Sequence, residues 1–313
     1  MFKRAIIVGG TGHLGASLGN FLQKKNFKVL ITTRNKKKFI KKLFKKKIIL
    51  NRLNIYNKND IKKLFFSFKP SHIFYFAGQS LPDKSFKNSI ETYKSNVIGC
   101  KNFLEIIRKY KINCKFINAA SSEMYGQINK INVYSKKKPI NPYGEAKVAS
   151  FNITKNFREK FGLNTYNAII FNTESFLRKK NHLIPKICLA AIKAKKFKKK
   201  TSFGNLNISR EWNWADEQMI YLYKFVNKKP QDFILSNGKS FKAIEMLKFA
   251  FKYFNLDYKK FIIIDKKYFR KRDIKNKKSD YLKCLKRNKI SRKNITYGKI
   301  LIQKLIKFYI NKL

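Results

Sequence analysis

The sequence predicts an α/β protein, a doubly wound parallel sheet followed by a smaller C-terminal α/β lobe. Two observations predict this class: short apolar runs alternate with helical stretches up to about residue 171, and a glycine-rich turn follows the first run. Parallel strands need crossover connections, which helices supply. We therefore expect a dinucleotide-binding domain over residues 1–172 and a second domain mainly over 173–313, with a segment near 212–240 returning to the first.

Each expected strand is a short apolar run, and a stretch with helical spacing separates it from the next. Six strands are expected in the first domain, at residues 5–8, 28–33, 47–53, 72–77, 115–120 and 165–171. Between them apolar residues recur with helical spacing, as Leu18, Phe21 and Leu22 do after the first strand. The expected helices lie at residues 15–25, after Asp60 as a cap, at 92–110 and at 142–161. In the second domain we expect helices at 185–194 and 212–226 and a strand at 233–235.

The composition is strongly basic. The chain of 313 residues has 73 Lys and Arg against 17 Asp and Glu, a net charge of +56. The lysine clusters are spread along the whole chain and form no arm or stripe, so we interpret them as solvated surface and expect no nucleic-acid partner. Mutual repulsion of these charges should be relieved by salt.

Cysteine and histidine usage argues against a disulfide framework and a metal centre. The 4 cysteines have no metal-knuckle or redox spacing, and the 3 histidines are far apart. No apolar run reaches the roughly 18 residues of a membrane span, and the apolar start is too short for a signal peptide. We expect a cytoplasmic protein.

The turn after the first strand has the spacing G-x-x-G-x-x-G, at Gly9, Gly12 and Gly15. Such a loop between a buried strand and a helix is typical of Rossmann dinucleotide sites, where the helix N-terminus faces the pyrophosphate. Its residues are the first cofactor-binding candidates: Gly9, Thr11, Gly12, His13, Leu14 and Gly15. Arg34 ends the second strand, and a cation there with no nearby carboxylate favours the 2′-phosphate of NADP over NAD.

A second set of candidates carries acid–base chemistry. Tyr143 and Lys147 form Y-x-x-x-K on an expected helix and so face the same way. A neighbouring ammonium stabilises a phenolate, which makes tyrosine a usable base near neutral pH. Ser121, Ser122 and Glu123 follow the fifth strand, at the edge where ligands bind in doubly wound sheets.

At this point the sequence resembles the GDP-mannose 4,6-dehydratase family, within the extended short-chain dehydrogenases/reductases. The segment from Ala120 to Gly126 is similar to the family's S-T-S-E-L-Y-G, and that from Asn141 to Lys147 to its S-P-Y-x-x-A-K. Three further segments resemble A-A-Q-S, F-N-H-E-S and L-G-N-L…R-D-W, and they lie at residues 77–80, 171–175 and 203–212. The last two segments are the ones that favour the GDP-mannose 4,6-dehydratase family over other short-chain dehydrogenases/reductases.

The resemblance implies a redox-neutral elimination of water. Tyr143 would take the 4-hydroxyl proton, Glu123 would remove the C5 proton, and Ser121 would hydrogen-bond the C4 oxygen. Lys147 would hold the cofactor ribose and tune Tyr143. NADP would take hydride from C4 and return it to C6, giving GDP-4-keto-6-deoxymannose.

The resemblance also implies binding residues. Toward the cofactor these would include Arg34, Asn54, Ala77, Gln79, Ser80, Tyr143, Lys147, Thr173 and Arg178. Toward the nucleotide sugar they would be Ser80, Ser122, Asn172, Lys186, Asn205, Arg210 and Arg270. Several positions depart from the family pattern, among them Asn54, Glu91, Thr173 and Pro185. These departures leave the identity of the sugar nucleotide open.

Two alternatives remain at this stage. One is a related epimerase, decarboxylase or 4-keto reductase of nucleotide sugars, since some decarboxylases also carry a glutamate after the serines. The other is a degenerate Rossmann module that binds a nucleotide or polyanion without catalysis. The helices at residues 92–110 and 142–161 could also pair with a second subunit, giving a homodimer or homotetramer.

Overall fold

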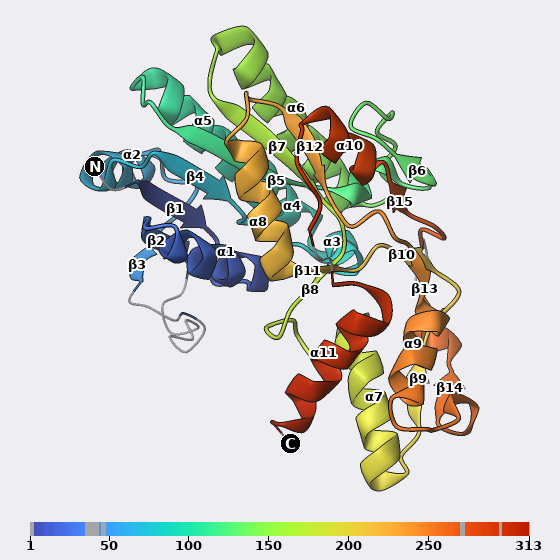
Figure 1. Cartoon of the computed structure of the whole chain (residues 1–313). Helices are drawn as coiled ribbons and strands as arrows, with labels where there is room; N and C mark the ends of the chain where they lie inside the picture. The colour runs from blue at the N-terminus through green and yellow to red at the C-terminus, as the bar shows by residue number, and fades with distance from the viewer. Residues whose placement is uncertain (1–2, 35–43, 45–47, 270–272, 294–295, 313) are drawn as a thin grey trace. The chain divides into compact units, whose positions relative to one another are not determined.

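The computed structural model describes residues 3–34, 44, 48–269, 273–293 and 296–312 (Figure 1). Backbone contacts divide the chain into two compact units. The sheet unit comprises residues 1–126, 133–170 and 218–235, and the C-terminal unit comprises 127–132, 171–217 and 236–313. The predicted division into domains at residue 172 stays a prediction, because compactness alone does not show which segments fold independently.

The sheet unit contains seven parallel strands, which confirms the predicted fold class. In spatial order they are β12 (Asp232–Leu235), β7 (Thr165–Ile170), β5 (Lys115–Ser121), β4 (His72–Tyr75), β1 (Arg4–Val8), β2 (Lys28–Thr33) and β3 (Ile49–Arg52). The chain places β2 and β3 on one side of β1 and then returns to place β4, β5, β7 and β12 on the other side, so the strand order reverses at β1. Ligands of doubly wound sheets bind at such a switch point, beyond the carboxyl ends of the strands.

Helices cover both faces of this sheet (Figure 1). On one face α2 (Lys58–Phe68), α5 (Gly99–Lys109) and α6 (Pro142–Phe161) enclose an apolar core, in which Phe65 and Phe103 lie edge to face. On the other face α1 (His13–Lys24) lies beside α8 (Ala215–Val226), and Phe21 contacts Tyr223. Burial of these side chains is the main stabilising term of the unit.

The expected helix at residues 92–110 is interrupted. The chain instead forms α3 (Pro82–Lys87), α4 (Ser89–Tyr93), a π-helical turn (Lys94–Ile98) and then α5. The Tyr75 hydroxyl donates a 2.7 Å hydrogen bond to the Ser95 carbonyl, the usual partner of the Gly99 amide. That amide bonds to the Lys94 carbonyl instead, one residue further back. A side chain from β4 therefore produces the π turn, and helical periodicity carries no sign of it.

Two smaller expectations are wrong. Asp60 does not cap α2, because Asn57 occupies the cap position and accepts hydrogen bonds from the Asn59 and Asp60 amides. The helix expected at residues 212–226 begins only at Ala215, since Asn213 and Trp214 form β11 (Asn213–Trp214) beside β8 (Thr173–Glu174).

The C-terminal unit has its own apolar core. It packs α7 (Leu183–Phe197), α9 (Ala243–Lys252) and α11 (Gly298–Ile310) against one another (Figure 1). The unit also contains α10 (Tyr281–Arg287) and four short strand pairs: β8 with β11, β6 (Lys130–Ile131) with β15 (Lys278–Ser279), β9 (Thr201–Phe203) with β14 (Ile262–Ile264), and β10 (Ser209–Arg210) with β13 (Phe241–Lys242). Among the described residues, no helix is both long and apolar enough for a membrane span, and no group of His, Cys, Asp and Glu could hold a metal ion.

Candidate active site

The glycine turn connects β1 to α1 at the switch point of the sheet. Gly9 has φ +73°, a conformation that other residues rarely adopt, and a Cβ there would lie 2.6 Å from the Ala77 Cα. A Cβ at Gly15 would lie 2.4 Å from the Gly10 Cα, so α1 can begin this close to the turn only with glycine there. At Gly12 a Cβ would have the Gly9 carbonyl at 3.9 Å as its nearest neighbour. The turn is therefore open at the position expected to face the pyrophosphate.

The N-terminus of α1 suits an anion. Gly12 is its cap residue, no side chain caps the first turn, and no acidic residue lies in that turn. The amides at the start of the helix are left to a ligand or to water, and the helix dipole favours negative charge at this end. Thr11, His13 and Leu14 lie in this turn and at the helix start. The residues present fit a dinucleotide pyrophosphate.

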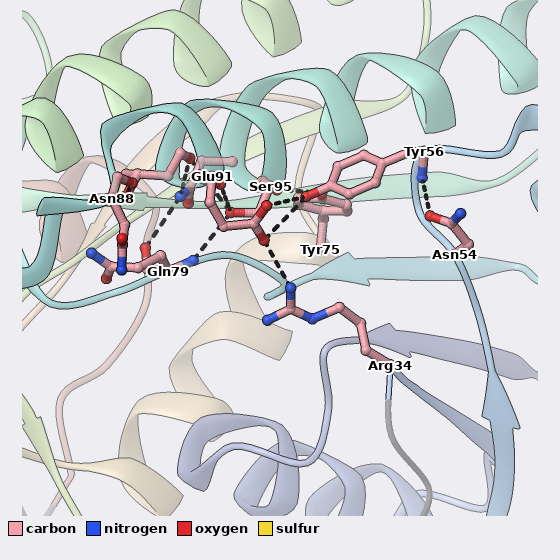
Figure 2. Close-up of polar contacts among 10 residues, drawn as sticks. Arg34, Asn54, Tyr56, Tyr75, Gln79, Asn88, Glu91 and Ser95 are labelled. Carbon is pink, nitrogen blue, oxygen red and sulfur yellow. Dashed lines mark hydrogen bonds and ion pairs between the residues drawn. The ribbon is translucent and has the colours of Figure 1, made fainter.

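The next part of the site lies where β2 and β3 end (Figure 2). Arg34 follows β2 and makes a 2.8 Å ion pair with Glu91 of α4. The expectation that Arg34 has no carboxylate nearby is thus wrong, because Glu91 is 57 residues away in the sequence. Asn54 follows β3, and its side-chain oxygen accepts a 3.0 Å hydrogen bond from the Tyr56 amide.

The segment after β4 carries Ala77, Gln79 and Ser80. The Gln79 amide donates to the Ser95 hydroxyl at 3.3 Å (Figure 2). Asn96 donates its side-chain amide to the Gln79 carbonyl at 3.1 Å. The Gln79 side chain itself bonds to both backbone groups of Leu81. The π turn therefore positions this segment beside the glycine turn, and the side chain of Gln79 stabilises the loop.

Ser121, Ser122 and Glu123 follow β5 at the same edge of the sheet. Ser121 ends the strand and caps a 3₁₀ turn (Ser122–Tyr125). Its hydroxyl accepts a 3.2 Å hydrogen bond from the Glu123 amide in that turn. Ser121 and Ser122 are buried, and Glu123 is partly exposed. The carboxylate can thus meet a ligand.

Tyr143 and Lys147 lie one turn apart on α6, as predicted, and both are buried. The Lys147 Nζ is 5.7 Å from the centre of the Tyr143 ring and donates a 2.7 Å hydrogen bond to the Ala119 carbonyl of β5. Burial lowers the pKa of Lys147 to about 8, while Cys100 opposes part of this change. The ammonium is therefore present at neutral pH and loses its proton in mildly alkaline solution.

Asn141 joins these two parts of the site, and the sequence candidates did not include it. Its side-chain oxygen caps α6 by accepting from the Gly144 amide at 2.8 Å, and its amide donates to Glu123 at 3.2 Å. A Cβ at Gly144 would lie 2.8 Å from the Glu123 carbonyl oxygen, so α6 approaches the turn closely. Asn before Pro is a recognised helix-start signal and could have identified Asn141.

The other candidates lie in the C-terminal unit. Asn172 accepts hydrogen bonds from Asn213 through its carbonyl, and Thr173 is buried with its hydroxyl on the Phe171 carbonyl. The Arg178 Nε lies 3.8 Å from Glu174. The Lys186 Nζ lies 4.7 Å from the ring centres of both Phe203 and Tyr268.

Two arginines complete the set. Arg210 is buried and makes a 3.0 Å ion pair with Asp273, with further hydrogen bonds to the Ser209 and Lys275 carbonyls. Asn205 accepts from the Asn207 amide. Arg270 lies outside the described residues. Binding of a nucleotide sugar by these residues stays a prediction.

Comparison with known proteins gives a consistent result. Residues 6–288 match the family model described as GDP-mannose 4,6 dehydratase. GDP-mannose 4,6 dehydratase 1 of Arabidopsis thaliana is 29% identical over 305 residues, which cover 90% of this chain and 83% of the plant protein. The human GDP-mannose 4,6 dehydratase is 28% identical over 264 residues, or 79% of this chain and 71% of the human protein.

Solved structures with the same fold include enzymes of nucleotide sugars. A dTDP-glucose 4,6-dehydratase from Bacillus anthracis, in complex with NAD, superposes with a TM-score of 0.85 at 16% identity, covering 99% of this chain and 97% of that one. A UDP-glucose 4-epimerase from Thermotoga maritima, with UDP-glucose, gives 0.85 at 16% identity and covers 99% of both chains. At such identities the likeness concerns the fold alone.

Proposed function

This chain belongs to the GDP-mannose 4,6-dehydratase family, and from that premise we propose that it converts GDP-mannose to GDP-4-keto-6-deoxymannose. The observation that carries the proposal is the direct bond between Asn141, the cap of the Tyr143 helix, and Glu123. This bond joins the start of the helix that carries Tyr143 to the turn that carries Glu123, at the carboxyl edge of the sheet, where the glycine turn after β1 also lies.

The cofactor is a pyridine dinucleotide, held by the glycine turn and the start of α1. We propose NADP, because Arg34 lies where a 2′-phosphate would be recognised. When bound, the dinucleotide supplies a hydride acceptor for C4 and a donor for C6. A reaction that restores its own cofactor needs no second substrate.

The residues of the chain supply the proton chemistry. Tyr143, as phenolate, accepts the proton of the 4-hydroxyl, and the ammonium of Lys147 stabilises this phenolate before the proton is transferred. Ser121 donates a hydrogen bond to the C4 oxygen. Glu123 accepts the C5 proton, which the neighbouring ketone makes acidic, and gives it to the C6 hydroxyl, which leaves as water. The proton held by Tyr143 then goes to C5 as C6 is reduced, so both residues return to their starting state.

We propose that residues of the C-terminal unit bind the nucleotide sugar. Lys186 and Arg210 are cations suited to a diphosphate, and Asn172 and Asn205 carry amides suited to sugar hydroxyls. The four cysteines are buried free thiols, which fits a reducing compartment such as the cytoplasm. A homodimer or homotetramer, and the absence of a nucleic-acid partner, remain predictions from the sequence.

The test is product analysis with GDP-mannose, UDP-glucose and dTDP-glucose offered separately to the NADP-loaded protein. We expect a 4-ketosugar from GDP-mannose with no net reduction of the cofactor. Glu123→Gln should abolish ketosugar formation and keep cofactor binding, whereas Glu105→Gln, which changes a surface carboxylate of α5, should keep both. A ketosugar formed equally well by Glu123→Gln would refute the proposed mechanism.

A further inference from the structure

The Arg34–Glu91 pair lies beside the glycine turn. Val8 of β1 is in register with Thr32 of β2, and the Thr32 hydroxyl accepts a 3.4 Å hydrogen bond from the Gly9 amide. Arg34 is two residues further along, at the carboxyl edge of the sheet. A dinucleotide on this turn would place its adenosine ribose near the end of β2. Glu91 therefore brings a carboxylate to the place where NAD and NADP differ.

Glu91 is held in this position by its neighbours (Figure 2). The Tyr56 hydroxyl lies 3.3 Å from both carboxylate oxygens and donates to them. Burial and the negative charge of Glu91 raise the pKa of Tyr56, so the phenol keeps its proton. The Ser95 hydroxyl donates a 2.6 Å bond to the backbone carbonyl of Glu91, which fixes the end of α4. Hydrogen bonds therefore fix both the backbone of Glu91, through Ser95, and its carboxylate, through Tyr56.

The two groups have opposite preferences. A guanidinium attracts a 2′-phosphate, which carries about two negative charges near neutral pH. A carboxylate accepts hydrogen bonds from the ribose hydroxyls of NAD and repels the phosphate. Because the guanidinium already bonds to Glu91, a phosphate must share it with a like charge or displace that charge.

We propose that Glu91 sets the ratio of the NADP and NAD affinities of this chain: it competes with the 2′-phosphate for Arg34 and so reduces the preference for NADP that Arg34 alone would give. This inference rests on the proposed function, which requires a pyridine dinucleotide. The side chains of Arg34 and Glu91 are 75% and 43% exposed, so water screens the interaction. A charge–charge effect at such a site is worth about tenfold in affinity.

The test measures the dissociation constants of NADP⁺ and NAD⁺ by calorimetry at fixed ionic strength, because a chain of charge +56 attracts any anion at low salt. For the unchanged protein we expect the two constants to agree within about tenfold. Glu91→Gln should tighten NADP⁺ about tenfold and leave NAD⁺ unchanged or weaker. Arg34→Gln should weaken NADP⁺ alone.

Two further variants separate this effect from general ones. Tyr56→Phe removes the donor that holds Glu91 and should shift the ratio in the same direction, by less than Glu91→Gln. Glu105→Gln is the matched control, since it removes a carboxylate that pairs with Lys58 and Lys101 in the same unit. It should leave the ratio of the two constants unchanged.

The possible failures are distinguishable. If the unchanged protein binds neither dinucleotide, the proposed function fails and the inference fails with it. A second outcome is that both dinucleotides bind while the ratio of their dissociation constants stays the same in Glu91→Gln. If a thermal melt shows that this variant is folded, that result overturns the inference alone. An equal tightening of both dinucleotides in Glu91→Gln and Glu105→Gln also overturns it, because the effect would then be one of total charge.

Discussion

The side-chain amide of Asn141 donates a 3.2 Å hydrogen bond to Glu123, while its oxygen caps the helix that carries Tyr143. One residue therefore supports both the start of α6 and the orientation of a carboxylate on a separate turn. The two roles use different atoms, so substitution can separate them.

We predict that Asn141→Ala lowers kcat at least tenfold with little change in KM, because Glu123 loses the donor that orients it. The lost cap should also cost about 1 kcal/mol of unfolding free energy. Asn141→Asp should keep the cap but lose activity, most strongly below neutral pH, because its carboxylate disfavours ionised Glu123. The same repulsion should lower its stability at neutral pH. Steady-state kinetics across pH and urea unfolding measure both effects.

Asn57→Ala is the control for this pair of variants. Asn57 caps α2 in the same way, through the Asn59 and Asp60 amides. It should lose similar stability and keep its full kcat. If Asn141→Ala keeps the kcat of the unchanged protein, Asn141 has no positioning role.

Local signals in the sequence predicted much of this site. The bounds of α6 agree with the expected residues 142–161, because Asn-Pro marks its start, glycine follows its end, and apolar residues recur between them. Except for the exposed edge strand β3, the strands of the sheet are mostly buried runs between two layers of helices, which is the pattern of a parallel sheet. These features depend on neighbours in the chain.

The features that the sequence did not predict depend on distant neighbours. Glu91 meets Arg34 only because β2 and α4 end at the same edge of the sheet. The π turn forms because Tyr75, on β4, takes the Ser95 carbonyl from its helical partner. Such contacts are set by tertiary packing, and no periodicity in a single segment encodes them.

We predict an alkaline limb in the pH profile of kcat with an apparent pKa near 8, set by Lys147. Burial lowers the pKa of this ammonium to about 8, so its charge is complete below that pH and lost above it. Lys147→Arg should move the limb upward, since a guanidinium keeps its charge to above pH 12. Lys147→Met should be inactive at all pH values. A limb of unchanged position in Lys147→Arg would assign it to another group.

Salt should stabilise this protein. Its net charge of +56 repels itself in the folded state, and added salt screens that repulsion. We expect the melting temperature to rise by several degrees between about 0.05 and 0.5 M KCl, over which the Debye length falls roughly threefold. Sucrose at equal osmolality serves as the uncharged control. A melting temperature that is flat in KCl would mean that this repulsion does not limit the stability of the folded protein.

Glu174 should make folding less favourable as the pH rises. It is buried, one of its oxygens has no hydrogen-bond partner, and Arg178 lies 3.8 Å away. Burial raises the pKa of this carboxyl from 4.5 to about 7, against a smaller opposite effect of Arg178. The folded state therefore holds a proton that the unfolded state releases between these two pH values, and the penalty is complete above pH 7.

Glu174→Gln removes this penalty. The variant should gain stability relative to the unchanged protein as the pH rises from about 4.5 to 8, by up to about 3 kcal/mol. Urea unfolding of both proteins at several pH values measures the difference, in which the common effect of net charge cancels. Glu159→Gln, an exposed carboxylate beside Lys155, should show no such pH dependence. A Glu174→Gln difference that stays constant across this range would mean that Glu174 is ionised at all these pH values, held by Arg178 more strongly than its burial opposes.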